Sequence, residues 1–309
     1  MNANSGTDTV IYTGGGALTG TLNGGADSDI LQLDATTDVT GATLTSFETI
    51  KLGGNLTIAT TQIAGASVNL IQGNGASTVT FTGTGNVFLN ENTGVTTFNA
   101  TSLAAGDTFS VDDDSATSDV TINIGVANFN MGASFTADKY TVNTGAALGA
   151  TQSISTAGAR TANDTVNVNG ASVHTIATGA GDDTINFNTT GGLTAADTVS
   201  GGAGTDTLRV VDVLAATDLN GVTGVEVFNL VAGASTVTPA NSVVAAYRGA
   251  GLKLLKRIQI SHDIGGSVPW WITLLLLAIE TGPIFFKMML VRGAYDYLDE
   301  NVKRLAAAR

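Results

Sequence analysis

The chain has 309 residues, a net charge of −13 and no cysteine. Disulfides are therefore excluded, and the acidic balance argues against a nucleic-acid partner, which requires basic residues to displace counterions. The charge is uneven, because residues 1–245 contain four Lys and Arg against 21 Asp and Glu, whereas residues 246–309 contain nine against five. Of the 39 glycines, 33 lie in the first part. The composition predicts two parts of different character.

Residues 1–238 show short alternations of apolar and polar residues and almost no helical periodicity. Examples are Val79–Phe81, Ile122–Ile124 and Ile185–Phe187. Such period-two runs of β-branched and aromatic residues, interrupted by Gly, Asn and Asp, are typical of strands and turns. Their spacing fits a solenoid with two strands per coil, or a sandwich. We predict an all-β repeat domain over 1–238, with a parallel β-solenoid or β-roll favoured and a sandwich as the alternative.

A glycine-rich turn that carries one aspartate into a strand recurs in this region. Gly201–Arg209 has the pattern G-G-x-G-x-D-x-(apolar)-x, Thr178–Asn186 departs from it at the first position, and Gly24–Gln32 departs at the fourth. A looser form, Asp followed by apolar-x-apolar, occurs at Asp8, Asp107 and Asp164. The glycines indicate turns with backbone angles that are closed to other residues.

The aspartates of these turns are expected to stack on neighbouring coils, because Asp164, Asp183 and Asp206 are 19 and 23 residues apart. Carboxylates about 4.8 Å apart repel by roughly 1 kcal/mol in water and about 3 kcal/mol at an effective dielectric near 20. A calcium ion between the rungs would offset this repulsion, since calcium accepts about six to eight oxygens in flexible geometry. The alternative is that the aspartates cap turns through hydrogen bonds to the backbone.

These turns resemble the nonapeptides of the repeats-in-toxin family, in which stacked copies bind calcium in a parallel β-roll. The resemblance implies a set of metal-binding positions at the turns, namely Asp27, Asp29, Asp164, Gly179, Gly181, Asp182, Asp183, Gly202, Gly204 and Asp206. A separate acidic run, Asp112–Asp114, is interpreted as a solvated loop.

A longer module occurs twice, at Leu22–Leu52 and at Val199–Leu230, with a one-residue difference in spacing. Each copy begins with Gly-Gly-Ala-x-Ser/Thr-Asp and ends with a strand in which Glu follows an apolar residue. The module resembles the repeats of bacterial surface-layer proteins and large adhesins. This resemblance implies a non-catalytic structural role at the cell surface, with self-association or lattice formation.

Residues 239–247 are predicted to be a linker, and residues 248–309 a helical membrane segment. The helix before the span is basic and amphipathic, so it is expected either at the membrane interface or packed on protein. Residues 268–291 would form a transmembrane helix about 36 Å long. Glu280, Pro283 and Lys287 form a polar stripe on this helix, which favours a partner helix or a water-filled cleft. The alternative is a buried helix of a soluble domain.

The same segment is similar to the final span of a bacterial membrane family, the domain of unknown function 4407. The similarity rests on Trp270-Trp271, on the order Glu280, Pro283, Lys287, and on the turn Arg292–Leu298. It implies an alternative function as a component of a multi-span membrane assembly. A joining of two reading frames is a third interpretation, in which the chain has no single function.

Catalytic signatures are missing from the sequence. It contains no G-x-S-x-G elbow, P-loop or H-E-x-x-H motif, and neither His174 nor His262 has a His or Cys neighbour at metal-ligand spacing. Residues 1–5 have no basic n-region and no apolar h-region, so no cleavable signal peptide is expected here. We therefore expect a bacterial protein of the membrane or cell surface that is not an enzyme.

Overall fold

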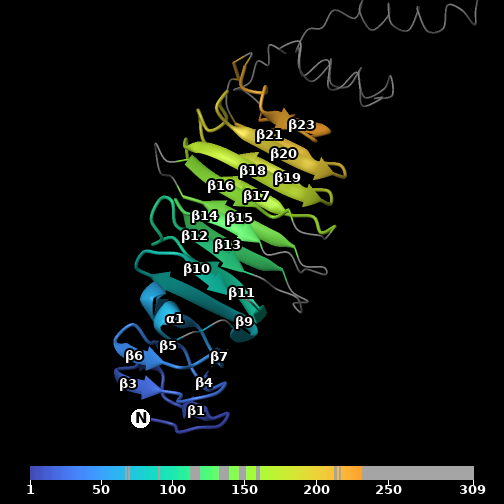
Figure 1. Cartoon of the computed structure of the whole chain (residues 1–309). Helices are drawn as coiled ribbons and strands as arrows, with labels where there is room; N and C mark the ends of the chain where they lie inside the picture. The colour runs from blue at the N-terminus through green and yellow to red at the C-terminus, as the bar shows by residue number, and fades with distance from the viewer. Residues whose placement is uncertain are drawn as a thin grey trace, which may run out of the picture. The chain divides into compact units, whose positions relative to one another are not determined.

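The computed structural model describes residues 1–66, 68, 70–89, 91–111, 119–131, 139–145, 151–157, 161–211, 214–215 and 217–231 (Figure 1). These residues all belong to one compact unit, Met1–Val243. The acidic run at 112–114, the predicted linker and the predicted membrane segment with its polar stripe lie outside the described residues.

The described strands form two main sheets and one separate strand pair. The first sheet contains, in spatial order, β1 (Thr9–Tyr12), β4 (Ile30–Leu33), β7 (Thr49–Leu52), β9 (Leu70–Thr82), β11 (Glu91–Asn99), β13 (Val120–Gly125), β15 (Tyr140–Thr144), β17 (Thr165–Val168), β19 (Thr184–Phe187), β21 (Thr207–Val210) and β23 (Val227–Leu230). Beside this row lie β2 (Gly16–Ala17), β5 (Thr37–Asp38) and β8 (Leu56–Ala59). The second sheet contains β10 (Val87–Leu89), β12 (Thr108–Val111), β14 (Asn128–Met131), β16 (Thr151–Ser155), β18 (Val173–Ala180), β20 (Thr198–Ala203) and β22 (Val222–Thr223). The separate pair is β3 (Gly20–Asn23) with β6 (Ala42–Thr45).

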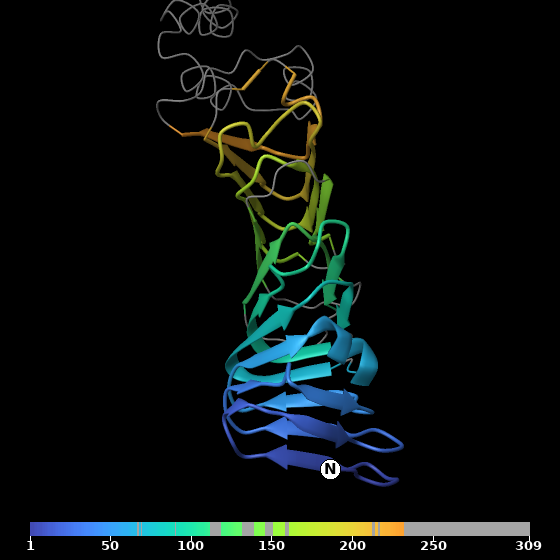
Figure 2. The same cartoon turned by 90° about the vertical axis from the view of Figure 1, so that its left-hand side faces the viewer.

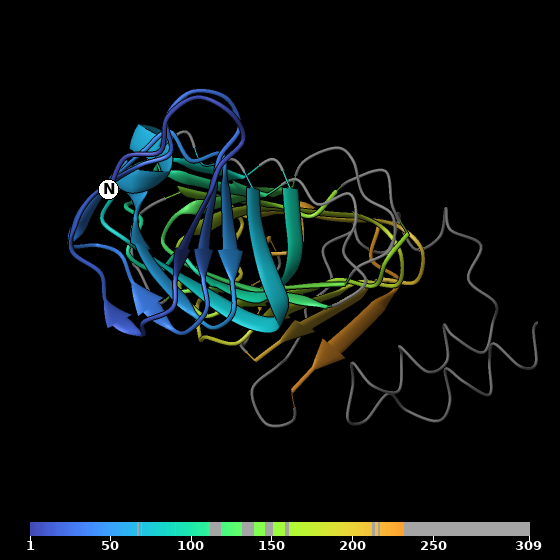
Figure 3. The ribbon, with the colours of Figure 1, turned by 90° about the horizontal axis from the view of Figure 1, so that it is seen from below.

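Successive strands alternate between the two sheets from β10 to β23, and each strand pairs in parallel with the equivalent strand of the next coil. Figures 1 and 2 show these strands stacked as rungs above one another, and Figure 3 shows the stack from its N-terminal end. The fold is therefore an all-β parallel solenoid, as predicted, and the sandwich alternative does not form. One short helix, α1 (Thr60–Ala66), lies between β8 and β9. Within the described residues, no helix has the length and apolar character needed to cross a membrane.

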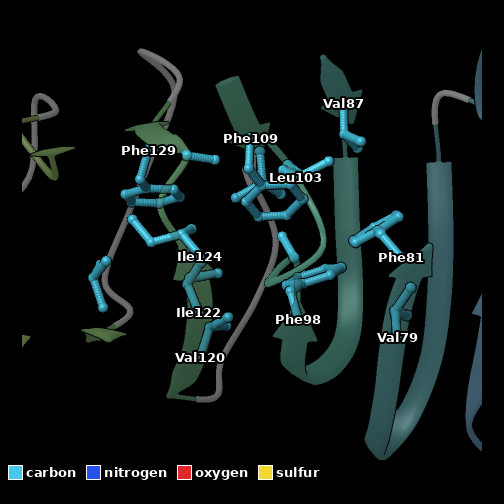
Figure 4. Close-up of a cluster of buried hydrophobic side chains, with 14 of the residues drawn as sticks. Val79, Phe81, Val87, Phe98, Leu103, Phe109, Val120, Ile122, Ile124 and Phe129 are labelled. Atoms are coloured by element: carbon cyan, nitrogen blue, oxygen red, sulfur yellow. The ribbon is translucent and has the colours of Figure 1, made fainter. Parts of the chain in front are cut away.

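The core is built from alternate residues of both sheets. In β13 and β17 the pattern of buried and half-buried side chains follows the apolar-polar alternation of the sequence. An aromatic column runs through the middle of the solenoid (Figure 4), in which Phe81 and Phe98 from the first sheet meet Phe109 and Phe129 from the second. Ring centroids of neighbouring members are 5.3–6.2 Å apart. Such pairs add about 0.5–1.5 kcal/mol each beyond area burial, so the column joins the two sheets.

The position of Phe109 within this column gives a stability test. Phe109 is fully buried and contacts three other rings, so Phe109→Ala should lower the free energy of unfolding by about 3–5 kcal/mol. Phe88 lies one coil earlier in the same sheet and is 58% exposed, so Phe88→Ala serves as the matched control and should change stability little. Denaturant unfolding of both variants measures the difference. Equal losses in the two variants would contradict the placement of the column.

Candidate functional site

Acidic residues occupy the position directly before a strand on coil after coil of the first sheet. Asp164 precedes β17, Asp183 precedes β19 and Asp206 precedes β21. Asp8 and Asp29 stand in the same position before β1 and β4. Parallel pairing in register stacks these positions, so the predicted alignment of Asp164, Asp183 and Asp206 is confirmed.

The carboxylates are joined to neighbouring coils through backbone N–H groups. The N–H of Asp164 donates to Oδ1 of Asp183 at 2.7 Å, and the N–H of Asp183 donates to Oδ1 of Asp206 at 2.8 Å. Tyr140 extends this series at one end by donating its N–H to Asp164 at 2.9 Å, and Glu226 ends it by accepting the N–H of Asp206 at 2.9 Å. We call Asp164, Asp183, Asp206 and Glu226 the carboxylate ladder.

A shorter copy of the ladder lies at the N-terminal end. The N–H of Asp8 donates to Oδ1 of Asp29 at 2.8 Å, and the N–H of Asp29 donates to Oε2 of Glu48 at 2.8 Å. Glu48 and Glu226 occupy equivalent places in the duplicated module and were not among the predicted site residues. Their shared position in the two module copies was the signal that could have identified them.

The aspartates do accept backbone N–H groups, as the turn-capping interpretation requires, but these N–H groups belong to a neighbouring coil. A backbone N–H lies between successive carboxylates, and a charge-assisted hydrogen bond to that N–H stabilises the ionised form. The repulsion expected between stacked carboxylates is therefore offset in part by the backbone itself. This arrangement needs no ion between the rungs to bring the carboxylates into register.

In the carboxylate ladder and in its shorter copy, one oxygen of several carboxylates has no hydrogen-bond partner. Oδ2 of Asp29, Asp183 and Asp206 is buried and unpartnered, and each of these residues is only 1% exposed. The backbone of a glycine covers two of these oxygens, because a Cβ on Gly24 would lie 2.8 Å from Oδ2 of Asp29 and one on Gly201 would lie 2.7 Å from Oδ2 of Asp206. Glycine is thus required at these two positions, where a Cβ would also collide with the carbonyl oxygens of Ser46 and Gly224.

The other predicted glycines allow neighbouring coils to approach closely. Gly179 pairs with Gly202 in adjacent strands, and a Cβ on Gly204 would collide with the carbonyl oxygen of Gly181. Gly204 has a φ of 140°, which residues with a side chain rarely adopt. In the first copy of the turn, Asp27 replaces this glycine and adopts a φ of 82°.

Two predicted ligands lie apart from the buried ladder. Asp27 and Asp182 are exposed, and each accepts an N–H from a neighbouring coil: Gly6 donates to Asp27 at 3.1 Å and Thr205 donates to Asp182 at 2.7 Å. The predicted metal-binding residues are therefore divided between the buried and the solvent side of the turn.

Burial and the neighbouring charges alter the proton affinity of the ladder. Burial, together with the charges of Asp164 and Asp206, raises the pKa of Asp183 to about 6. Burial raises the pKa of Asp206 as well, and the charges of Glu226 and Asp182 act in the same direction. The ladder thus holds carboxyl groups that accept a proton more readily than an exposed aspartate does.

The ability of these residues to hold a metal follows from their donor atoms. Among the described residues there is no group of three or more His, Cys, Asp or Glu placed to hold a metal ion. Oδ1 of Asp183 and of Asp206 already accepts an N–H, so the buried Oδ2 atoms are the oxygens left for a cation. A calcium ion would have to complete its coordination with turn carbonyl oxygens.

A second kind of carboxylate turn lies before the strands of the other sheet. In each case an aspartate accepts the N–H of the residue three positions earlier, at 2.6–2.8 Å, and donates its own N–H to that residue's carbonyl oxygen. The members are Asp107, Asp197 and Asp218. Asp107 is among the aspartates predicted from the sequence; Asp197 and Asp218 are not, although the repeated pattern Leu-x-Ala-x-Asp marks all three.

Asp107 and Asp197 also bind the preceding coil. Asp107 accepts the N–H of Gly85 at 2.8 Å, and Asp197 accepts the N–H of His174 at 2.6 Å. The imidazole Nδ1 of His174 lies 3.3 Å from Oδ1 of Asp197, and the side chain is fully buried. His174 therefore belongs to the internal packing of the solenoid.

Comparison with known proteins found no matching family model, no matching curated protein and no matching solved structure. The class of protein that the fold and the carboxylate turns define is a parallel β-solenoid of repeat type.

The raised pKa of Asp183 predicts a pH dependence of stability. Because the folded-state pKa lies above the ordinary value of 3.8, its stabilising contribution is complete below pH 3.8 and is lost as the pH rises through about 6. A shift of this size corresponds to at most about 3 kcal/mol. Asp183→Asn keeps an oxygen that accepts the N–H of Asp164, so this variant should lose that part of the pH dependence.

Chemical denaturation at several pH values between 4 and 7 measures the effect. Asp38→Asn is the control, because a hydrogen bond from Thr40 lowers the pKa of Asp38 and keeps it ionised over this range. Equal pH profiles for the wild type and Asp183→Asn would refute the assignment.

Proposed function

We propose that this chain is a non-catalytic structural protein of the bacterial cell surface, of surface-layer or adhesin type. The observation that supports this most directly is the carboxylate ladder. Its carboxylates each accept an N–H from another coil, so these groups serve to join coils rather than to face a substrate. A stack joined in this way, with a continuous apolar core, is suited to act as a rigid spacer or a lattice element.

A surface location can be tested on intact cells that produce the full chain. Lys51 and Lys139 are exposed, so an amine-reactive label that cannot cross membranes should modify both lysines without lysis. A cytoplasmic protein of the same cells, labelled only after lysis, is the control. Labelling of Lys51 and Lys139 only after lysis would contradict the surface assignment. Peptide mass spectrometry identifies the modified sites.

The proposal includes a calcium ion bound at the aspartate turns, with Oδ2 of Asp183 and Asp206 as its carboxylate ligands. A buried, unpartnered carboxylate oxygen is costly, and either a proton or a cation would satisfy it. Membrane anchoring by residues 248–309, with a partner helix at the polar stripe, remains a proposal from the sequence alone.

The calcium proposal predicts that the ion raises the melting temperature of the full chain. Calcium at about 100 times its dissociation constant would add about 2.7 kcal/mol, or roughly 5–10 °C for a unit of this size. Asp206→Asn should reduce this shift, whereas Asp34→Asn, an exposed carboxylate outside the ladder, should preserve it. Thermal melts in calcium and in a strong chelator provide the measurement. Identical melts would eliminate calcium but leave the structural role intact.

A further inference from the structure

The outer face of the first sheet presents two regular columns of uncharged side chains. From β9 to β21 each strand of this sheet carries Thr at one outward position, and from β11 to β19 each carries Asn two residues later. The threonine column is Thr78, Thr97, Thr121, Thr141, Thr165, Thr184 and Thr207. The asparagine column is Asn99, Asn123, Asn143, Asn167 and Asn186. Figure 1 shows the strands that carry them stacked along the solenoid.

The columns form a lattice of nearly constant spacing. Neighbouring strands lie about 4.8 Å apart and alternate residues of one strand about 6.7 Å apart, so the seven rungs cover a strip about 30 Å long. All of these residues are half-buried, because their side chains pack against those above and below. Between them, residues such as Phe98, Ile122 and Val142 point inward and are fully buried. The strip is therefore anchored to the rigid core.

Hydrogen bonds fix the asparagine side chains in place. Nδ2 of each Asn donates to Oδ1 of the Asn on the preceding coil, at 2.6 Å for Asn123, 2.9 Å for Asn143, and 2.8 Å for both Asn167 and Asn186. Threonine is stiff as well, because its branched Cβ restricts χ1. Little side-chain entropy remains to be lost when a partner binds this strip.

The hydrogen-bonding capacity that faces outward is balanced. An amide that uses one N–H and one lone pair in the column retains one N–H and one lone pair, and a hydroxyl both donates and accepts. The two columns carry no charge until Arg209 takes the asparagine position and donates to Asn188 at 3.0 Å. In a chain of net charge −13, this neutral strip is suited to a neutral partner that donates and accepts equally and repeats at a regular spacing.

These properties favour an ordered water lattice over other partners. Protein interfaces depend on buried aromatic or Arg anchors, and the two columns contain no aromatic residue between Thr78 and Thr207. Stacking of sugar rings would require aromatic side chains as well. In ice, each water molecule donates and accepts in equal number, and the molecules repeat in rows. Once the first rung is bound, the other rungs are held close to the same crystal surface. Many weak contacts can therefore add up to strong binding.

We propose that the threonine and asparagine columns bind the surface of ice crystals. This inference goes beyond the structural role and does not depend on calcium or on a surface location. The rows of hydroxyl and amide groups would hold water molecules in positions that continue the crystal. Growth of ice would then be arrested where the protein is bound.

Thermal hysteresis and crystal shape, measured on the full chain, test the proposal. The wild type should open a gap between melting and freezing temperatures and should produce faceted crystals. Thr165→Lys places a charge at the fifth of the seven rungs and leaves four intact rungs on one side and two on the other, so the gap should fall about twofold or more. Thr175→Lys is the matched control, because Thr175 is exposed on β18 of the opposite sheet, and it should preserve the gap.

Circular dichroism melts establish that each variant is folded. If Thr165→Lys does not fold, Asn143→Asp replaces it, since this change keeps the volume and introduces a charge into the asparagine column. A folded wild type without hysteresis would overturn the proposal, as would equal losses in Thr165→Lys and Thr175→Lys. Retention on crystalline cellulose or chitin without any effect on ice would also overturn it, and would assign the strip to a polysaccharide.

Discussion

The structure depends on a hydrogen bond from the backbone N–H of one coil to a carboxylate of the next. At the point where a turn becomes a strand, a buried N–H group needs an acceptor, and leaving it unpaired is costly. A carboxylate satisfies it more strongly than a neutral acceptor does. In the carboxylate ladder the same residue supplies the N–H to one neighbour and the oxygen to the other, as Asp183 does between Asp164 and Asp206. Each rung therefore fixes the register of two coils.

The pKa of each buried carboxylate depends on the balance between burial, hydrogen-bond donors and neighbouring charges. Burial acts on both Asp183 and Asp197, yet their pKa values shift in opposite directions. Burial alone would raise the pKa of Asp197, but hydrogen bonds from His174 and Thr194 reach both of its oxygens and lower it. Asp183 accepts fewer hydrogen bonds, and the charges of Asp164 and Asp206 add to the effect of burial, so its pKa rises. The ladder is the less satisfied of the two kinds of turn.

Local patterns in the sequence were sufficient to predict the strands, the parallel solenoid and the stacking of the ladder aspartates. They were not sufficient for contacts that depend on how one coil lies on the next. Glu226 accepts the N–H of a residue 20 positions earlier, whereas Asp164 accepts the N–H of a residue 24 positions earlier. No single sequence period therefore identifies both contacts. Asp182 and Asp183 are adjacent, and only the path of the turn places one in solvent and the other inside. Calcium binding and the membrane segment remain predictions.

The same four-residue repeat supplies both the ladder aspartate and the outward Thr and Asn of the columns. In Asp164–Asn167 and in Asp183–Asn186, the aspartate enters the turn, the next residue is an outward Thr, the third is buried and the fourth is an outward Asn. Because side chains alternate along a strand, a slip of one residue would bury the polar column and expose the core. The carboxylate that accepts an N–H from the preceding coil prevents that slip. The regular spacing on the outer face is therefore a consequence of the hydrogen bonds at the start of each strand.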